Sequence, residues 1–168
     1  MKDCSQLGLQ VQELAGGNGQ GLDELIALWA EYFPDYAELP ANVDELRLAV
    51  LGQAVVPGLR PHLWLVRQHE QPVGMSFFLY NPARALGMLL FFALRPEARR
   101  LAPPGFDRLS DFLVAEMLAQ VAEDGAGQAL GLALEVDSPA LAERYQHMGL
   151  RLFHLRYGEP SGGQTASM

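Results

Sequence analysis

Tyr145 is the residue of this sequence whose type and position could do chemistry most directly. It lies in the segment ALEVDSPALAERYQHMGLRLF, residues 133–153. A free tyrosine has a pKa of about 10, so its hydroxyl is protonated at neutral pH, and the question is whether this hydroxyl has a chemical role. The alternative is a structural tyrosine that packs its ring against a sheet and leaves the hydroxyl in water. In either case other elements must fix the position of the ring.

The residues around Tyr145 predict a strand, a short helix and a second strand. The run Ala129–Val136 is apolar without alternation, as expected for a strand that is covered on both faces. Ser138 is then a candidate helix N-cap with Pro139 in the first turn, and Gly149 is a candidate left-handed stop. This pattern places Tyr145 about one turn before the end of a helix that packs against a sheet.

The remainder of the chain predicts a strand, two helices, a meander of three strands and a long helix. The expected strands are 7–14, 62–69, 72–80 and 86–96, and the expected helices are 22–33, 42–53 and 106–121. The runs 72–80 and 86–96 are apolar on both faces and should be central strands. The order β-α-α-β-β-β-α-β-α-β predicts an α/β fold, with a mixed, mostly antiparallel central sheet and helices on both of its faces.

Length and composition restrict the class of protein. A chain of 168 residues predicts a single domain, here 1–157, followed by a disordered tail at 158–168. No apolar stretch is long enough to span a membrane, and the start lacks the apolar core of a signal peptide. Cys4 is the only cysteine, which favours a cytoplasmic location. The net charge of −8 argues against a nucleic-acid partner.

The element order and two segments resemble the GCN5-related N-acetyltransferase (GNAT) superfamily. The first segment is LLFFALRPEARR, a strand that runs into an arginine-rich turn before a long helix, and the second is the late segment with Tyr145. The resemblance covers residues 7–157, with Leu150 where the family usually has Phe. It implies acetyl transfer from acetyl-coenzyme A to an amine of a small molecule or peptide, by direct attack in a ternary complex. In that reaction Tyr145 would be the general acid. Phe91, Phe92 and Ala93 stand where a Glu might serve as base, so no base is evident in that strand. Glu135 is a substitute candidate, and its alternative is a solvated acid at the end of a strand.

The loop expected to hold the pyrophosphate departs from the family's Gln/Arg-x-x-Gly-x-Gly/Ala turn. Pro103 and Pro104 enter it, and proline has no N–H group to donate. A longer turn could still bind the coenzyme. The residues that the resemblance assigns to cofactor binding are Leu94, Arg95, Arg99, Arg100, Leu101, Ala102, Gly105 and Phe106. The alternative is a non-catalytic GNAT-fold ligand-binding or interaction module that has lost acetyl-CoA binding.

The resemblance implies an acceptor site lined by the first two predicted helices, which the segment EYFPDYAELP joins. Glu31 and Asp35 beside Tyr36 would suit a cationic amine held between carboxylates and an aromatic ring, although a charged loop with packed aromatics would look the same. The four histidines lack the spacing of a metal site, so no metal is expected. Phe153 and Tyr157 in the last predicted strand leave a homodimer open.

Overall fold

The computed structural model describes residues 7–38, 40–53, 56–136 and 138–153. The chain divides into two compact units, residues 1–135 and 136–168, and the whole sheet lies in the first. In the described ranges, no helix is both long and apolar enough to cross a membrane.

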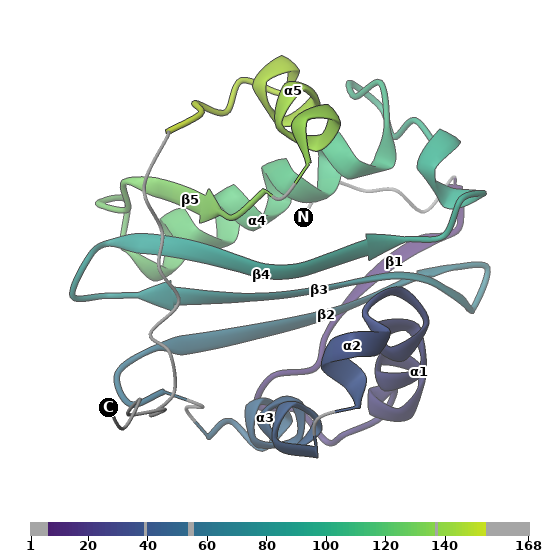
Figure 1. The fold of residues 1–168 in the computed structure, drawn as a ribbon, viewed down its shortest axis with the longest axis vertical. Coiled ribbons are helices and arrows are strands. Elements are labelled where there is room, and N and C mark those ends of the chain that lie inside the picture. The colour runs from purple at the N-terminus through teal and green to yellow at the C-terminus, as the bar shows by residue number, and fades with distance from the viewer. Residues whose placement is uncertain (1–6, 39, 54–55, 137, 154–168) are drawn as a thin grey trace, which may run out of the picture. The chain divides into compact units, whose positions relative to one another are not determined.

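The sheet of the first unit has five strands in the order in which they occur along the chain (Figure 1). They are β1 Leu9–Glu13, β2 Arg60–Gln68, β3 Gln71–Asn81, β4 Leu86–Leu94 and β5 Gly131–Leu134. The first four pair antiparallel, whereas β5 runs parallel to β4. The prediction of a mixed, mostly antiparallel sheet is therefore confirmed, and β3 and β4 are interior strands as their apolar runs indicated.

Helices cover both faces of this sheet. The elements α1 Leu22–Tyr32, α2 Pro34–Ala37 and α3 Pro40–Val50 lie on one side, and α4 Leu109–Asp124 lies on the other (Figure 1). Strand alternation divides β3 between the two layers. Met75, Phe77 and Leu79 face α1 and α3, in a buried cluster that includes Trp29 of α1 and Leu46 of α3. This apolar contact fixes the α1–α3 layer on the strands.

Three helix starts differ from the sequence predictions, and prolines account for them. Pro34 was expected only to end the first helix, but it occupies the first position of α2, where a missing N–H group costs nothing. Pro40 likewise begins α3, two residues before the predicted start. The helix predicted from Phe106 begins at Leu109, because the residues before it form a tight turn.

The second unit contains α5, Pro139–His147. The Leu141 N–H group donates to the Ser138 hydroxyl at 3.2 Å, and Gly149 has φ of 91°, so the predicted cap and stop are confirmed. The expected last strand is not formed at residues 150–153. Its remainder to Tyr157 and the predicted tail at 158–168 lie outside the described residues.

Candidate functional site

The edge of β4 that faces β5 is paired over only half of its length. β5 pairs with Leu86–Leu89, and β4 continues to Leu94, so that Leu90–Leu94 has a strand partner on the β3 side alone (Figure 1). Backbone N–H and C=O groups along an unpaired edge are available to a ligand that carries amide groups. Although β4 is an interior strand, its residues Leu90–Leu94 thus form an open edge on the side of β5.

A β-bulge lies at the point where the two strands cease to pair. Phe77 and Phe78 of β3 pair with Phe91 and Leu89, so Leu90 has no opposite residue and its side chain is 43% exposed. A bulge of this kind bends the strand and increases its local twist. It therefore accounts for the divergence of β4 from β5 directly after Leu89.

The loop after β4 ends in a tight turn that contains both prolines. Pro104 and Gly105 occupy its central positions, Gly105 has φ of 84°, and the Phe106 N–H group donates to the Pro103 carbonyl at 2.9 Å. These are the features of a type II β-turn, which favours Pro followed by Gly. The prolines therefore shape the turn and do not occupy the first turn of α4, where anions bind.

The N-terminus of α4 follows this turn and has unused hydrogen-bond donors. Within the described residues, the N–H groups of Asp107, Arg108 and Leu109 have no acceptor. Such groups at the start of a helix of 16 residues attract anions, because they point away from the helix and carry its positive dipole. The Asp107 carboxylate opposes this attraction.

The arginines of the loop divide into engaged and available groups. Arg95 forms an ion pair with Glu31 of α1 at 3.1 Å, and the Nε of Arg99 donates to the Leu94 carbonyl at 2.9 Å. Arg100 and Arg108 are exposed and form no ion pair with any described residue. Among the described residues, the loop arginines without an ion pair are therefore Arg99, Arg100 and Arg108, and the side chains of Arg100 and Arg108 also have no hydrogen bond.

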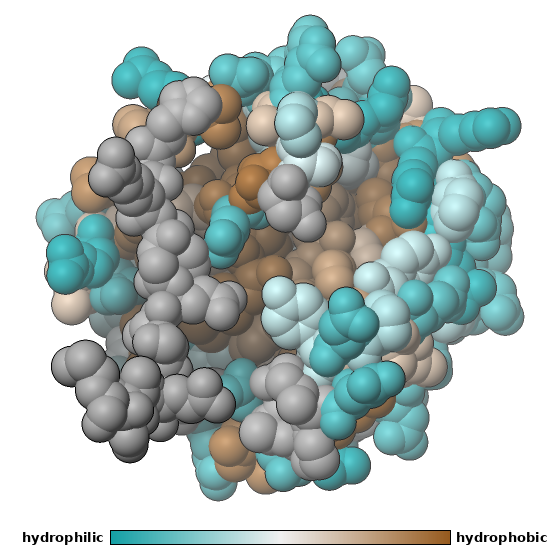
Figure 2. Space-filling view, viewed as in Figure 1, coloured by the Kyte–Doolittle hydropathy of each residue, from teal (hydrophilic) through white to brown (hydrophobic). Residues whose placement is uncertain are grey.

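Aromatic residues of α1, α2 and the residue between them gather around Phe91, which follows the bulge in β4. The ring of Phe91 is contacted edge-on by Trp29, Phe33 and Tyr36, with centroids 5.6, 5.0 and 5.3 Å away. Tyr36 nevertheless remains 51% exposed. Hydrophobic side chains are gathered near the middle of the face in Figure 2, over the strands, and hydrophilic side chains surround them. The α1–α2 connection thus presents an aromatic surface next to the open edge.

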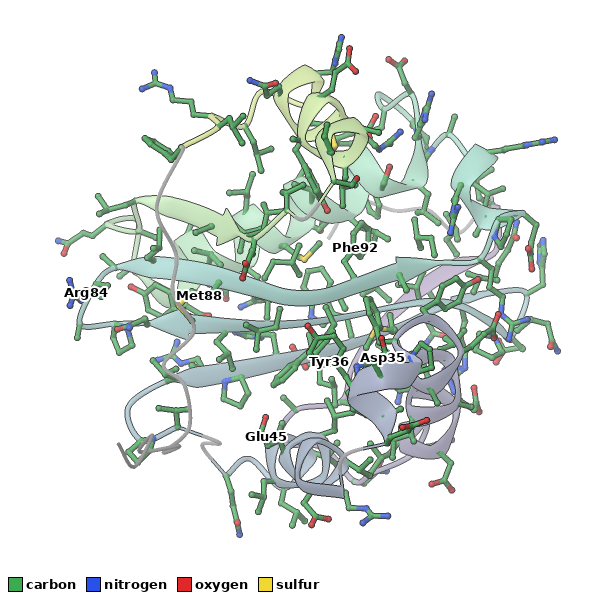
Figure 3. All side chains as sticks on the ribbon, viewed as in Figure 1. Asp35, Tyr36, Glu45, Arg84, Met88 and Phe92 are labelled. Atoms are coloured by element: carbon green, nitrogen blue, oxygen red, sulfur yellow. The ribbon has the colours of Figure 1, made fainter. Side chains whose placement is uncertain are left out.

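Negative charge is concentrated on the same helices. Residues 22–50 contain seven acidic residues and one arginine, a net charge of −6 in a chain whose total is −8. Asp35 and Glu45 are exposed, and Figure 3 shows them with Tyr36 on one side of the sheet. Glu31 is held by Arg95, so Asp35 is the predicted acceptor-site acid that has no ion pair among the described residues. This layer favours a cationic ligand.

No protein-family profile matches the sequence, and no curated protein sequence matches it. Several solved structures, however, have a similar fold. An aminoglycoside acetyltransferase from an uncultured soil metagenomic sample, HMB0005, matches with a TM-score of 0.63 and 19% identity, over 90% of this chain and 97% of that one. The aminoglycoside N-acetyltransferase AAC(6')-Iy in complex with CoA gives 0.62 and 13%, over 89% and 94%. A tandem GNAT protein from the clavulanic acid biosynthesis pathway gives 0.54 and 20%, over 84% of this chain and 43% of that one.

This chain has the GNAT fold. The match extends over the five-strand sheet and its flanking helices, as the sequence resemblance implied. The diverging β4 and β5 and the loop before α4 are thus features of a GNAT-fold protein, and the predicted cofactor-binding residues from Leu94 to Phe106 lie along that loop.

Several of these predicted cofactor-binding residues have structural contacts of their own. Leu94 is buried, and the ring of Phe106 packs against Phe112 of α4 at 5.5 Å. Ala102 and Gly105 are exposed, and Leu101 is half-buried. In this GNAT-fold loop, exposed backbone and arginine side chains are accordingly the groups available for an anion.

The two residues predicted to be catalytic differ in their surroundings. Tyr145 is 8% exposed in α5, and burial raises its pKa above the ordinary value of 10.0, against a smaller lowering by the Arg144 charge. Its hydroxyl is therefore firmly protonated at neutral pH, as a general acid requires. Glu135 is exposed directly after β5. Both roles still rest on the GNAT resemblance.

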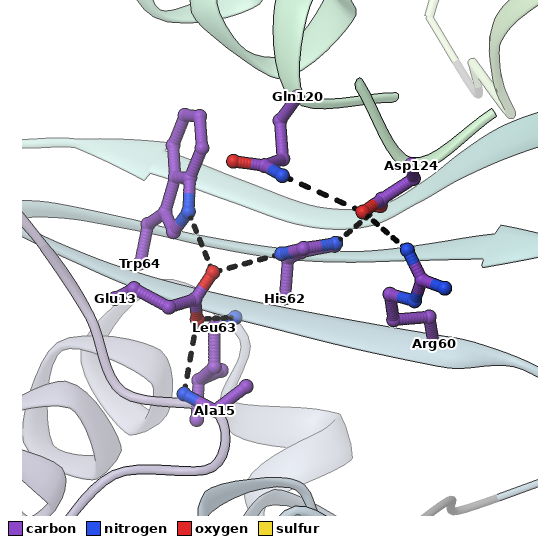
Figure 4. Close-up of polar contacts among 8 residues, drawn as sticks. All are labelled: Glu13, Ala15, Arg60, His62, Leu63, Trp64, Gln120 and Asp124. Atoms are coloured by element: carbon purple, nitrogen blue, oxygen red, sulfur yellow. Dashed lines mark hydrogen bonds and ion pairs between the residues drawn. The ribbon is translucent and has the colours of Figure 1, made fainter. Parts of the chain in front are cut away.

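A partly buried polar cluster had no signal in the sequence. His62 of β2 contacts Glu13 of β1 and Asp124 of α4 (Figure 4). These residues are 49 and 62 positions apart along the chain, and a single histidine in an apolar strand gives no signal of such partners. Among the described residues, no group of three or more His, Cys, Asp or Glu side chains could hold a metal ion.

Proposed function

We propose that this protein is an N-acetyltransferase that moves an acetyl group from acetyl-coenzyme A to a primary amine of a small molecule or peptide. The observation that carries the proposal is the unpaired edge of β4 beyond Leu89, which leads directly to the loop before α4. The fold it shares with acetyltransferases, one of them in complex with CoA, supports it. The cytoplasm is the proposed location, as the single cysteine suggested.

The residues of this chain fit the two parts of the coenzyme that need recognition. The pantetheine arm carries amides, which can pair with the open edge at Leu90–Leu94 as an added strand would. The pyrophosphate carries negative charge, which the free N–H groups of Asp107, Arg108 and Leu109 and the Arg100 guanidinium can hold. The prolines do not prevent this, since the turn they form ends before these amides.

The chemistry requires a proton for the departing sulfur. When the amine nitrogen attacks the thioester carbonyl, a C–N bond forms and the C–S bond breaks, and the thiolate that leaves must be protonated. We assign this proton to the Tyr145 hydroxyl, as the resemblance implies, and its raised pKa supports the assignment. Glu135 or a water molecule would accept the proton that the amine loses.

The acceptor that this surface suits best is a cationic small-molecule amine. The net charge of −6 on residues 22–50 attracts a cation, and Tyr36 with Asp35 offers an exposed ring beside a carboxylate. One of the matched acetyltransferases was solved with sisomicin. Glu31 contributes through its ion pair with Arg95, which ties α1 to the end of β4.

Acetyl-coenzyme A should stabilise the protein against heat in a saturable manner. A ligand that binds only the folded state adds about 2.7 kcal/mol of stability at a hundredfold excess over its Kd. We expect a rise in Tm with acetyl-CoA and with CoA, and a smaller rise with pantetheine, which lacks the phosphates. A flat response to millimolar acetyl-CoA would contradict the proposal and favour a non-catalytic interaction module on the same fold.

Replacing Asp35 with Asn should raise the KM for a multiply charged amine by about two- to fivefold and leave kcat unchanged, because one screened surface attraction is lost. Initial rates with sisomicin and with butylamine as acceptors measure this, and the larger effect is expected for sisomicin. Asp44→Asn is the matched control, since Asp44 is an exposed acid of the same layer that already pairs with Arg47 at 3.1 Å. Equal effects of the two substitutions would remove Asp35 from the acceptor site.

A further inference from the structure

His62 bridges two carboxylates in the first unit (Figure 4). Its Nδ1 lies 2.8 Å from Oε2 of Glu13, and its Nε2 lies 2.6 Å from Oδ2 of Asp124. The His62 and Asp124 side chains are 9% and 6% exposed, so both are largely excluded from water. Three segments that are distant along the chain, the ends of β1 and α4 and the start of β2, therefore meet at one imidazole ring.

The contacts at both nitrogens determine how many protons the cluster holds. An ionised carboxylate only accepts hydrogen bonds, and a neutral imidazole has a single N–H group. With neutral His62, one of the two contacts would set a nitrogen lone pair against an oxygen lone pair. The geometry therefore requires an imidazolium that donates to both Glu13 and Asp124, or one additional proton on a carboxylate.

The hydrogen bonds around the carboxylates place that additional proton on His62. Glu13 accepts from the Leu63 and Ala15 N–H groups at 2.8 and 2.9 Å and from the Trp64 indole at 3.0 Å. Asp124 also accepts from Arg60 at 2.7 Å. Both carboxylates are thus surrounded by donors and act as acceptors, which leaves His62 as the donor in both of its contacts.

The charges within the cluster balance only when His62 is positive. Glu13 from β1 and Asp124 from α4 are the negative groups, and Arg60 and His62 from β2 are the positive groups. β3 contributes the ring of Phe78, stacked on His62 at 4.7 Å, and the titratable phenol of Tyr80 on the same face. Loss of the His62 proton would leave an excess negative charge beside a buried ring, which is costly in such surroundings.

Each partner of His62 stands at the end of an element. Glu13 is the last residue of β1, directly before the chain turns towards α1. Asp124 is the last residue of α4, and seven positions later the chain enters β5 at Gly131. The cluster thus fixes the point where the chain leaves β1 and the point where it leaves α4. From α4 the chain continues to β5, the strand that borders the open edge of β4.

We propose that the Glu13–His62–Asp124 cluster is a proton-dependent latch, which holds the end of α4 and the end of β1 to β2 while His62 is an imidazolium and releases them when it loses its proton. The inference does not depend on the acetyltransferase proposal, because every group in it lies outside the proposed site.

The direction of the pH dependence follows from the same contacts. Burial lowers the pKa of His62, but the hydrogen bonds and charges of Glu13 and Asp124 outweigh burial and raise the pKa above the ordinary 6.5. A raised pKa means that the folded state binds the proton more tightly than the unfolded chain. The stability from the latch is therefore complete below pH 6.5 and is lost as the pH rises through the raised pKa of His62.

Nitrogen NMR of the histidine rings in the full chain tests the protonation state. We expect both His62 nitrogens to be protonated at neutral pH and to titrate with a midpoint above 6.5, with the signals assigned by their loss in His62→Gln. Asp124→Asn and Glu13→Gln, which keep the side-chain shape and remove one charge each, should each lower the midpoint. His147, exposed on α5, is the internal comparison and should not respond to either substitution. A single neutral tautomer at neutral pH would overturn the proposal.

Amide hydrogen exchange tests the release. The Gly125 and Gly127 N–H groups bond to Val121 and Ala122 at the end of α4, and the Leu14 N–H group bonds to Leu63 after β1. Their protection, corrected for intrinsic exchange, should fall at least about tenfold as His62 titrates, relative to amides in the middle of β3. In Asp124→Asn, the pH at which this protection is lost should decrease by the same amount as the midpoint of the His62 titration. Protection at these amides that is constant through the titration would leave His62 a static ion pair and refute the latch.

Discussion

Replacing Tyr145 with Phe is expected to lower kcat for acetyl transfer by roughly 10²- to 10⁴-fold, the usual contribution of a positioned general acid. The substitution removes one oxygen atom and keeps the buried ring, so the fold should persist. The affinity for acetyl-CoA should change little, because the groups proposed to bind the coenzyme lie at residues 90–109. The loss should therefore appear in kcat and not in the Kd for the coenzyme, which separates a chemical role from a structural one.

Single-turnover rates together with calorimetric titration of acetyl-CoA measure the two quantities. Tyr80→Phe is the matched control, since Tyr80 is also a buried tyrosine and has no proposed part in transfer. The raised pKa of Tyr145 adds a second expectation, that kcat of the native protein does not fall through ionisation of this residue until the pH exceeds 10.0. Equal kcat values for Tyr145→Phe and Tyr80→Phe would exclude Tyr145 as the acid.

Reversing the charge of both Arg100 and Arg108 should weaken acetyl-CoA binding by roughly 10²- to 10⁴-fold, if each arginine makes one charge-assisted hydrogen bond to the pyrophosphate. Both side chains are exposed and form no ion pair with any described residue, so the double change Arg100→Glu and Arg108→Glu breaks no known structural contact. Thermal stability without ligand should therefore stay close to that of the native protein, and the effect should be confined to binding.

Titration at two salt concentrations provides the measurement. Binding by the native protein should weaken with salt, and the slope should be smaller in the double variant because fewer charges take part. Arg84→Glu is the control, because Arg84 is exposed in the β3–β4 turn at a different place in the sequence and changes the net charge in the same direction. If Arg84→Glu weakened acetyl-CoA binding as much as the double variant does, the loss would come from the net charge of the protein. The loop after β4 would then not be the phosphate site.

The class of fold could be predicted from local patterns in the sequence. The apolar runs that became β3 and β4 lacked alternation and proved to be interior strands, and Ser138 with Gly149 marked the ends of α5 correctly. Signals of this kind are local, because a cap or a strand period depends on residues a few positions apart. Even the turn at Pro103–Phe106 could have been predicted, since Pro-Gly at its centre is typical of a type II turn.

The features that define the site depended on residues far apart in the chain. The bulge at Leu90 exists only relative to β3, and the open edge exists because β5 stops pairing at Leu89. Glu31, which is predicted to lie in the acceptor site, forms an ion pair with Arg95, a residue 64 positions away along the chain. No periodicity in the sequence encodes which of several charged residues will meet after folding.

By itself the sequence determined the order of the strands from β1 to β5 and of the helices α1, α3, α4 and α5, the interior strands and the caps of α5, because each depends on neighbouring residues. Only the tertiary structure decided that, within the described part of the chain, the first α4 amides have no acceptor and Arg100 and Arg108 have no ion pair, and that His62 contacts two carboxylates. Those outcomes depend on which distant groups approach to within hydrogen-bonding distance, and it is packing of the whole chain that sets this distance.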